Sequence, residues 1–248
     1  MLSRCHPAWA GVQHRGVGKE TDHRTAVVLT AIAGFVDAAG FLALFGLFTA
    51  HVTGNLVVVG AALAREHTER AAVRLAVIPI FMLGVAATTL VVRRLRAQGV
   101  PPLVPLFALE AAALVAFLAL GLALGSRLEA DAWALFAVGG AAMLAMGIQN
   151  GTTRLVIAGL PTTMMTGNVT QFAIDLVDWL APARGSARRD AWPRLATTGS
   201  VVLGFVAGAA SGALTMRLVG FPSTLAPILG LAWLIVCQRR RDAAAPGG

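Results

Sequence analysis

The sequence predicts an all-α membrane protein with about six transmembrane helices and two short broken or re-entrant helices, built from an internal repeat. Composition is the first observation: 57% of the 248 residues are hydrophobic, only 13% are charged, and the mean hydropathy is +0.74. A soluble domain of this length could not bury so much apolar surface. The other two observations are a set of long apolar runs and a segment that occurs twice.

The duplicated segment covers residues 34–55 and 147–168. The two copies align without a gap at a constant offset of 113 residues and share eight identities in 22 positions, ending on the same Thr-Gly-Asn. A repeat of this length suits a duplicated membrane bundle, an organisation common among transporters. Half of the chain is therefore predicted to be a diverged copy of the other half.

Six apolar runs have about the 20 residues that a helix needs to cross a membrane. They are 25–48, 73–92, 103–125, 132–153, 195–216 and 222–237. Two further segments, 55–64 and 168–181, are too short to cross, and each begins at the Asn of a Thr-Gly-Asn. Thr or Asn can cap a helix and Gly permits a sharp turn, so these segments are predicted to be half-helices that begin inside the membrane.

Positive charge predicts the topology. With six crossings, most of the 20 Lys and Arg residues lie on the side of both chain ends, which makes both termini cytoplasmic. Eight crossings would give the same distribution, so charge does not decide between them and segment length favours six. Three spans in each copy predict inverted repeats. The predicted parts are a cytoplasmic tail (1–24), a first membrane repeat (25–125), a second membrane repeat (126–238) and a cytoplasmic tail (239–248).

Asp37 lies near the centre of the first predicted span. A carboxylate facing lipid there would cost several kcal/mol, so Asp37 should face protein or water. It is interpreted as a protonatable or cation-binding group on a transport path, and the alternative is a neutral Asp bonded across helices. Its repeat equivalent is Asn150, beside Gln149. These residues are predicted to line an internal polar cavity.

The two Thr-Gly-Asn sequences are the other candidate part of the pathway. A half-helix that starts inside the membrane presents unpaired N–H groups and about half a positive charge, which favours an anionic or polar group. The alternative is that they only cap a structural loop. Both glycines are expected to mark backbone breaks, through positive φ or close helix approach. The residues are Thr53, Gly54, Asn55, Thr166, Gly167 and Asn168.

Other polar residues are less clearly linked to a transport pathway. Gln171 and Asp175 share one face of the second short helix, which either lines a cytoplasmic vestibule or is the wet face of an interfacial helix. Glu110 is expected to snorkel or to make a packing bond. Because Met164 is the repeat equivalent of His51, a symmetric metal site is not supported. His51 is expected to pack or to make a local hydrogen bond.

The remaining patterns limit the class of protein. Gly204, Gly208 and Gly212 recur every four residues, which predicts close helix packing within the bundle or between subunits of a homo-oligomer. The sequence has no nucleophile, zinc-hydrolase, phosphate-loop or dinucleotide motif, so no enzyme activity, cofactor or metal is predicted. The net charge of +8 is interpreted as a topology signal, and no nucleic-acid partner is expected.

Two stretches of the chain resemble a known family. They are AGFVDAAGFLALFGLFTAHVTGNLVVVGAAL and, about a hundred residues later, MGIQNGTTRLVIAGLPTTMMTGNVTQFAIDL. They resemble the YoaK-type domain-of-unknown-function family of bacterial inner-membrane proteins, and the resemblance covers nearly all of the chain after residue 24. It implies a multi-spanning protein of the inner membrane, of a kind sometimes labelled a permease, with no settled substrate.

The predicted function is a secondary transporter or channel-like permease for a small polar or anionic solute, with proton coupling through Asp37 as one option. The expected partners are the lipid bilayer and that unidentified solute. The alternative is a non-transporting membrane protein with an assembly or sensory role, in which the buried polar residues serve helix packing alone.

Overall fold

The computed structural model describes residues 19–64, 70–157, 165–181 and 187–244, and these residues form helices joined by short turns. The α-helices are α1 (Lys19–Ala43), α2 (Val52–Ala64), α3 (Ala71–Ala97), α4 (Leu103–Leu124), α5 (Ala132–Leu155), α6 (Met165–Leu180), α7 (Ala187–Val219) and α8 (Leu225–Ala244). Two 3-10 turns, η1 (Gly125–Arg127) and η2 (Phe221–Thr224), follow α4 and precede α8.

Six of these helices, α1, α3, α4, α5, α7 and α8, are long and apolar enough to cross a membrane. The other two, α2 and α6, have 13 and 16 residues and are shorter than a crossing requires. This confirms the predicted all-α class with six candidate spans and two short helices.

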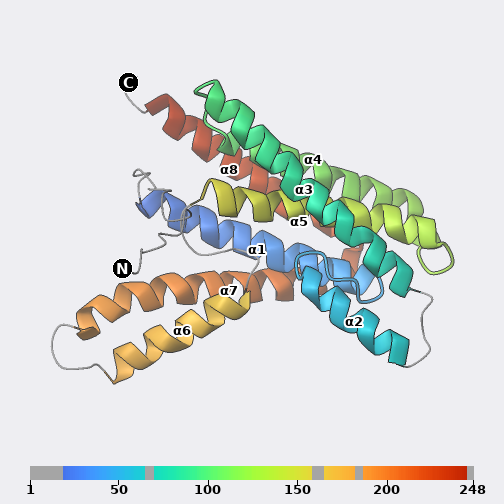
Figure 1. The fold of residues 1–248 in the computed structure, drawn as a ribbon, viewed down its shortest axis with the longest axis horizontal. Coiled ribbons are helices and arrows are strands. Elements are labelled where there is room, and N and C mark those ends of the chain that lie inside the picture. The colour runs from blue at the N-terminus through green and yellow to red at the C-terminus, as the bar shows by residue number, and fades with distance from the viewer. Residues whose placement is uncertain (1–18, 65–69, 158–164, 182–186, 245–248) are drawn as a thin grey trace, which may run out of the picture.

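The long helices run side by side along one axis of the molecule (Figure 1). The start of α1 and the end of α8 lie at the same end of the bundle, as an even number of crossings requires. The short helices α2 and α6 both begin near the middle of the bundle's length and run toward opposite ends (Figure 1). This is the arrangement expected of two re-entrant helices that enter from opposite sides.

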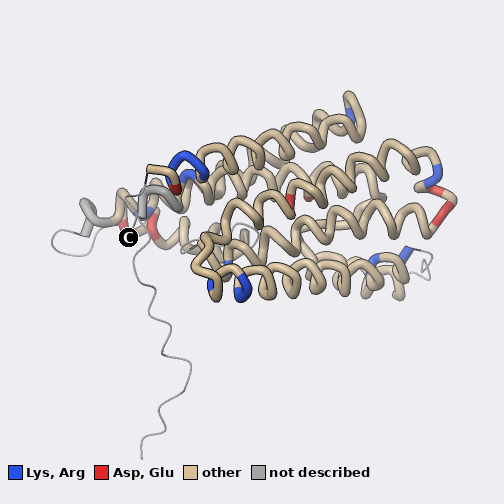
Figure 2. Tube along the Cα trace, turned by 90° about the horizontal axis from the view of Figure 1, so that it is seen from above, with Lys and Arg blue, Asp and Glu red and all other residues tan. Residues whose placement is uncertain are grey.

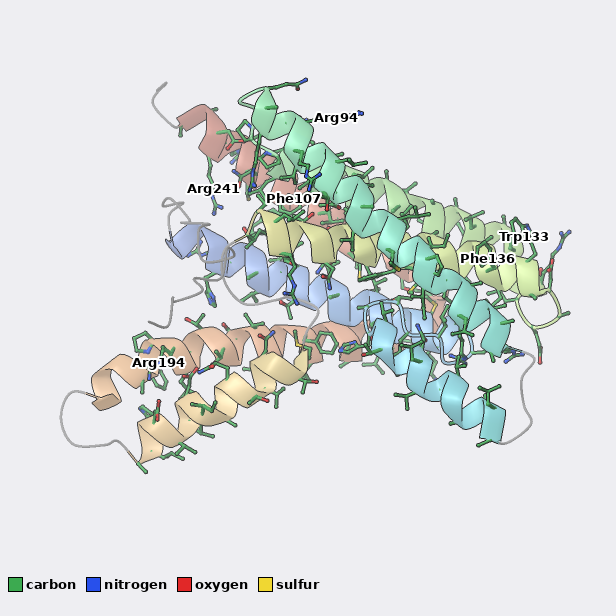
Figure 3. The ribbon with its side chains drawn as sticks, viewed as in Figure 1. Arg94, Phe107, Trp133, Phe136, Arg194 and Arg241 are labelled. Atoms are coloured by element: carbon green, nitrogen blue, oxygen red, sulfur yellow. The ribbon has the colours of Figure 1, made fainter. Side chains whose placement is uncertain are left out.

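Charged residues gather at the two ends of the bundle and are rare between them (Figure 2). Arg94, Arg194 and Arg241 all lie toward the end at which α1 starts and α8 finishes, whereas Trp133 lies at the opposite end (Figure 3). The middle of the bundle therefore has the apolar character of a membrane-embedded layer.

The first span ends earlier than predicted. α1 stops at Ala43 instead of continuing to residue 48, and the chain then takes left-handed backbone angles at Phe45 (φ 54°) and Gly46 (φ 80°). Both Thr-Gly-Asn sequences lie within the first turn of their helices, α2 and α6, and neither Gly54 nor Gly167 has a positive φ. The predicted positive φ at these glycines was wrong, because in the first half the turn is made earlier. Gly54 does show the close approach that was the other expectation, since a Cβ there would lie 2.9 Å from the Phe48 ring.

The helices pack in a crossed pattern. α1 of the first half lies against α7 of the second half, while α5 of the second half lies against α3 of the first. A methyl group added to Gly34 would overlap the carbonyl oxygen of Phe205, and one added to Gly147 would overlap that of Phe81. Gly34 and Gly147 are equivalent positions of the duplicated segment, so the two interfaces use the same contact.

A second pair of glycine–carbonyl contacts is also equivalent in the two interfaces. Gly208 of α7 packs against the carbonyl of Ala31, and Gly84 of α3 packs against that of Leu144. Gly212 packs against the backbone of α1 as well, so the predicted small-residue stripe serves packing within the bundle. Paired contacts of this kind are what inverted repeats require, although the inverted relation itself stays a prediction.

Candidate functional site

The candidate site is built around residues 44–51, called here the break segment, which link α1 to α2 without helical structure. Its backbone N–H and C=O groups cannot pair with one another as they would in a helix. In an apolar bundle these groups need other partners. Side chains from three different helices supply them: Asp37 of α1, Asn55 of α2 and Arg74 of α3.

Asp37 anchors the end of the break segment. Its Oδ1 accepts hydrogen bonds from the backbone N–H groups of Thr49 and Ala50, both at 2.7 Å, and a longer contact of 3.5 Å joins it to the N–H of His51. The side chain is buried, with 7% of its surface exposed. Several N–H donors converging on one oxygen stabilise a carboxylate where water is scarce.

The other oxygen of Asp37 binds His51. The His51 Nδ1 lies 2.6 Å from Oδ2 of Asp37, and the imidazole also contacts the Phe205 ring edge-on, with the ring centroids 5.4 Å apart. The hydrogen bond to Asp37 and the negative charge of its carboxylate raise the pKa of His51 above 6.5, although burial opposes this. About a third of the imidazole is exposed at the surface of the bundle.

Asn55 and Arg74 hold the rest of the break segment. The Asn55 amide, fully buried, accepts from the N–H of Phe48 at 2.9 Å and donates to the same residue's carbonyl at 2.8 Å. The Arg74 guanidinium donates to the carbonyls of Phe45 and Gly46, and Arg70 stacks over the Phe45 ring at 3.8 Å. The irregular backbone is therefore fixed in one conformation.

A groove of about 300 Å³ opens beside Asp37 between α1 and α7. Apart from the carboxylate, its walls are apolar and include Gly34, Ala38, Phe41, Phe48, Phe205 and Ala209. Asn150 is not among the lining residues. Asp37 therefore faces a groove with mainly apolar walls instead of the polar cavity expected, because Phe side chains of α1, the break segment and α7 line it. Its proximity to Asn150 stays a prediction.

Within the Thr-Gly-Asn sequences, only the Asn side chains are buried. Asn55 and Asn168 have 0% and 1% exposed surface, whereas Thr53 and Thr166 are exposed. Gly54 packs against the Phe48 ring, and Gly167 has no described atom within 4 Å of the position of a Cβ.

In the second half, the segment that corresponds to the break segment lies partly at 158–164, outside the described residues. Gln149 donates from Nε2 to the carbonyl of Leu29 at 2.7 Å and so joins α5 to α1. Asn150, on the same helix, is half-buried.

Gln171 and Asp175 belong to a network between α6 and α7. The fully buried Asp175 accepts from Gln171 at 3.0 Å, from Thr198 at 3.1 Å and from Arg194 at 3.4 Å. Arg194 also pairs with Asp178 at 3.2 Å. Asp175 thus points at α7 and secures the α6–α7 hairpin, whose polar contacts lie between the two helices.

Two results were not expected from the sequence. His51 makes the local hydrogen bond predicted for it, but its partner is the most deeply placed acid of the first span. Arg74 belongs to no motif of the sequence, although it binds the break segment. The described residues include no cluster of three His, Cys, Asp or Glu side chains able to hold a metal ion.

The fold and the site together define a multi-pass α-helical membrane protein with an acid–imidazole pair at the non-helical segment between α1 and α2. Residues 25–237 match the profile of the family described as "Protein of unknown function (DUF1275)", and the chain belongs to this family. It is also similar to the UPF0700 transmembrane protein YoaK of Bacillus subtilis (strain 168), with 31% identity over 151 residues. That match covers 60% of this chain and 64% of the relative, which is less than two thirds of the relative's length. No solved structure matches the chain.

Proposed function

We propose that this protein is a proton-linked secondary transporter or channel-like permease of the bacterial inner membrane, with both termini in the cytoplasm. The observation that carries the proposal is the 2.6 Å contact between His51 and Asp37, at the point where the chain re-enters an apolar bundle. Ionisable groups inside a membrane protein commonly mark proton or ion pathways. The histidine can gain and lose a proton near neutral pH, which few side chains can do.

Asp37 and His51 have different roles in the proposed proton site. Asp37 is held by backbone N–H groups and stays in place, so it orients the imidazole and favours its protonated form. His51, which is partly exposed and borders Phe205 of α7, carries the exchangeable proton. A change of charge at His51 would alter the contact between α1 and α7, the helices on either side of the groove.

The solute is proposed to be small and polar or anionic. α2 and α6 begin near the middle of the bundle's length (Figure 1), so the positive ends of their dipoles lie at mid-depth. The groove beside Asp37 has aromatic and aliphatic walls, which favours a solute with a small apolar part, such as a short-chain organic acid.

The orientation is proposed from the arginine distribution. Arg94, Arg194 and Arg241 lie toward the same end of the bundle as the start of α1 and the end of α8 (Figure 3). The positive-inside tendency assigns that end to the cytoplasm.

A test uses proteoliposomes that enclose a pH-sensitive dye. When a series of short-chain organic acids is added outside, wild-type vesicles should show a solute-specific change of internal pH larger than that of empty vesicles. His51→Gln should lose this change while remaining folded, as a cooperative thermal unfolding transition in detergent would show. If no solute gives a wild-type signal above empty vesicles, or if His51→Gln transports like wild type, proton-linked transport through this pair is wrong.

One observation favours the alternative, a non-transporting assembly or sensory protein. Every hydrogen bond of Asp37 and Asn55 shown here ends in the break segment, so both residues also have a structural role. If this alternative holds, Asp37→Asn and His51→Gln would change the stability of the protein but would not change the flux of any solute.

A further inference from the structure

Glu110 is a buried acid that the proposed site does not use. It lies on α4 with 0% of its surface exposed. Neither carboxyl oxygen has a hydrogen-bond partner among the described residues. The sequence had suggested snorkelling or a packing bond, and both expectations were wrong, because the side chain reaches neither the surface nor another polar group.

The surroundings of Glu110 are apolar. On its own helix it belongs to the buried face with Leu106, Phe107, Ala113 and Leu114. That helix packs against α5 and α8, and η1 and η2 touch its far end. The lining of the groove beside Asp37 comes from α1, the break segment and α7, so Glu110 lies outside that site.

No charge on the packed elements offsets that of Glu110. α5 has no ionisable side chain before Arg154 near its end, and α8 has none before Cys237, which is followed by Arg239. Arg127 of η1 lies 17 residues further along the chain than Glu110, beyond the far end of α4. An ionised carboxylate without a partner or water would be very costly at this position.

A metal cation would not compensate the charge of an ionised Glu110. Hard cations take six or more oxygen ligands, and the described residues include no group of His, Cys, Asp or Glu able to hold a metal ion. A single proton needs no further ligand, and the neutral acid costs far less to bury than the ion.

We infer that Glu110 is a proton-binding site within the membrane, separate from the Asp37–His51 pair, and that its proton leaves only when water or an opposite charge reaches α4.

Infrared spectroscopy of the full-length protein in phosphatidylcholine vesicles tests the inference at neutral pH. The difference between wild type and Glu110→Gln should contain the C=O stretching band of a neutral carboxylic acid. Glutamine keeps the size and hydrogen-bonding capacity of the side chain but cannot take part in proton exchange. Asp178→Asn removes a half-exposed acid and serves as the control, for which carboxylate bands are expected. Carboxylate bands in the Glu110 difference spectrum would overturn the inference.

A second measurement uses only the wild-type protein, in case Glu110→Gln fails to fold. Dicyclohexylcarbodiimide enters apolar regions and reacts with neutral carboxyl groups. The carboxyl oxygen adds to the central carbon of the reagent, the acid proton moves to one of its nitrogens, and the adduct rearranges to an N-acylurea without loss of any atom. Mass spectrometry should find this adduct on Glu110 and little on Asp178. An unmodified Glu110 would overturn the inference. Neither measurement depends on transport, so the inference can fail or succeed independently of the proposed function.

Discussion

His51 Nδ1 lies 2.6 Å from Oδ2 of Asp37, so an imidazole that follows the first membrane helix is fixed to a carboxylate within it. This contact closes the break segment on α1, because the same carboxylate also binds the N–H groups of Thr49 and Ala50. One acid thereby orients a titratable group and organises an irregular backbone. The two roles can be separated by substitution.

The stability of the protein should depend on the protonation of His51. The pKa of His51 is raised in the folded state by the hydrogen bond to Asp37, so the stabilisation is fully present below pH 6.5 and is lost as the pH rises through the folded-state pKa. Thermal unfolding in detergent at a series of pH values should show a falling Tm over this window. His51→Gln should remove most of this pH dependence, and an unchanged profile would contradict the assignment.

Asp37→Asn and Asp37→Leu should differ strongly in stability. Asparagine retains an oxygen that can accept from Thr49 and Ala50, whereas leucine leaves both N–H groups buried without an acceptor. Each orphaned group costs about 1–3 kcal/mol, so Asp37→Leu should unfold at a much lower temperature. Asp178→Asn, at a half-exposed acid on α6, is the control and should stay close to wild type. Equal Tm values for both Asp37 variants would mean that the break segment does not depend on this oxygen.

Glycine substitutions should report on the crossed helix packing. Gly34→Ala and Gly147→Ala place a methyl group against the backbone of α7 and α3 respectively, and overpacking of this kind costs about 1–3 kcal/mol. Gly60→Ala meets open space on α2, and Gly167→Ala meets no described atom on α6. These two should be neutral or slightly stabilising, because alanine favours a helix by about 0.5–1 kcal/mol. Measured Tm values in the reverse order would refute the close approach.

The proposed orientation can be tested by cysteine labelling in cells. In a Cys5→Ser, Cys237→Ser background, Arg94→Cys and Arg241→Cys should be protected from a membrane-impermeant maleimide until the membrane is opened. Trp133→Cys, at the other end of the bundle, should be labelled in intact cells because residue 133 is 70% exposed. Labelling of Arg94→Cys and Trp133→Cys from the same side would contradict six crossings.

The sequence by itself determined the fold class. Apolar runs of about 20 residues must cross the membrane as helices, because only a helix satisfies its own backbone in lipid. The six spans and the short length of α2 and α6 follow from this, as does the placement of Asp37 away from lipid. The sequence also showed that Gly34 and Gly147 are equivalent, because they lie at the constant offset of the repeat. It did not show which carbonyl groups these glycines contact.

Only the tertiary structure decided which polar groups meet. Asp37 and His51 are 14 residues apart, and no periodicity predicts their contact, because the chain between them leaves the helix through left-handed angles at Phe45 and Gly46. Arg74 reaches those residues from α3 at a sequence distance that no local pattern records. The burial of Glu110 without a partner likewise depends on how α5 and α8 pack against α4. Helix formation is a local property of the chain, whereas pairing between polar groups depends on how distant segments pack.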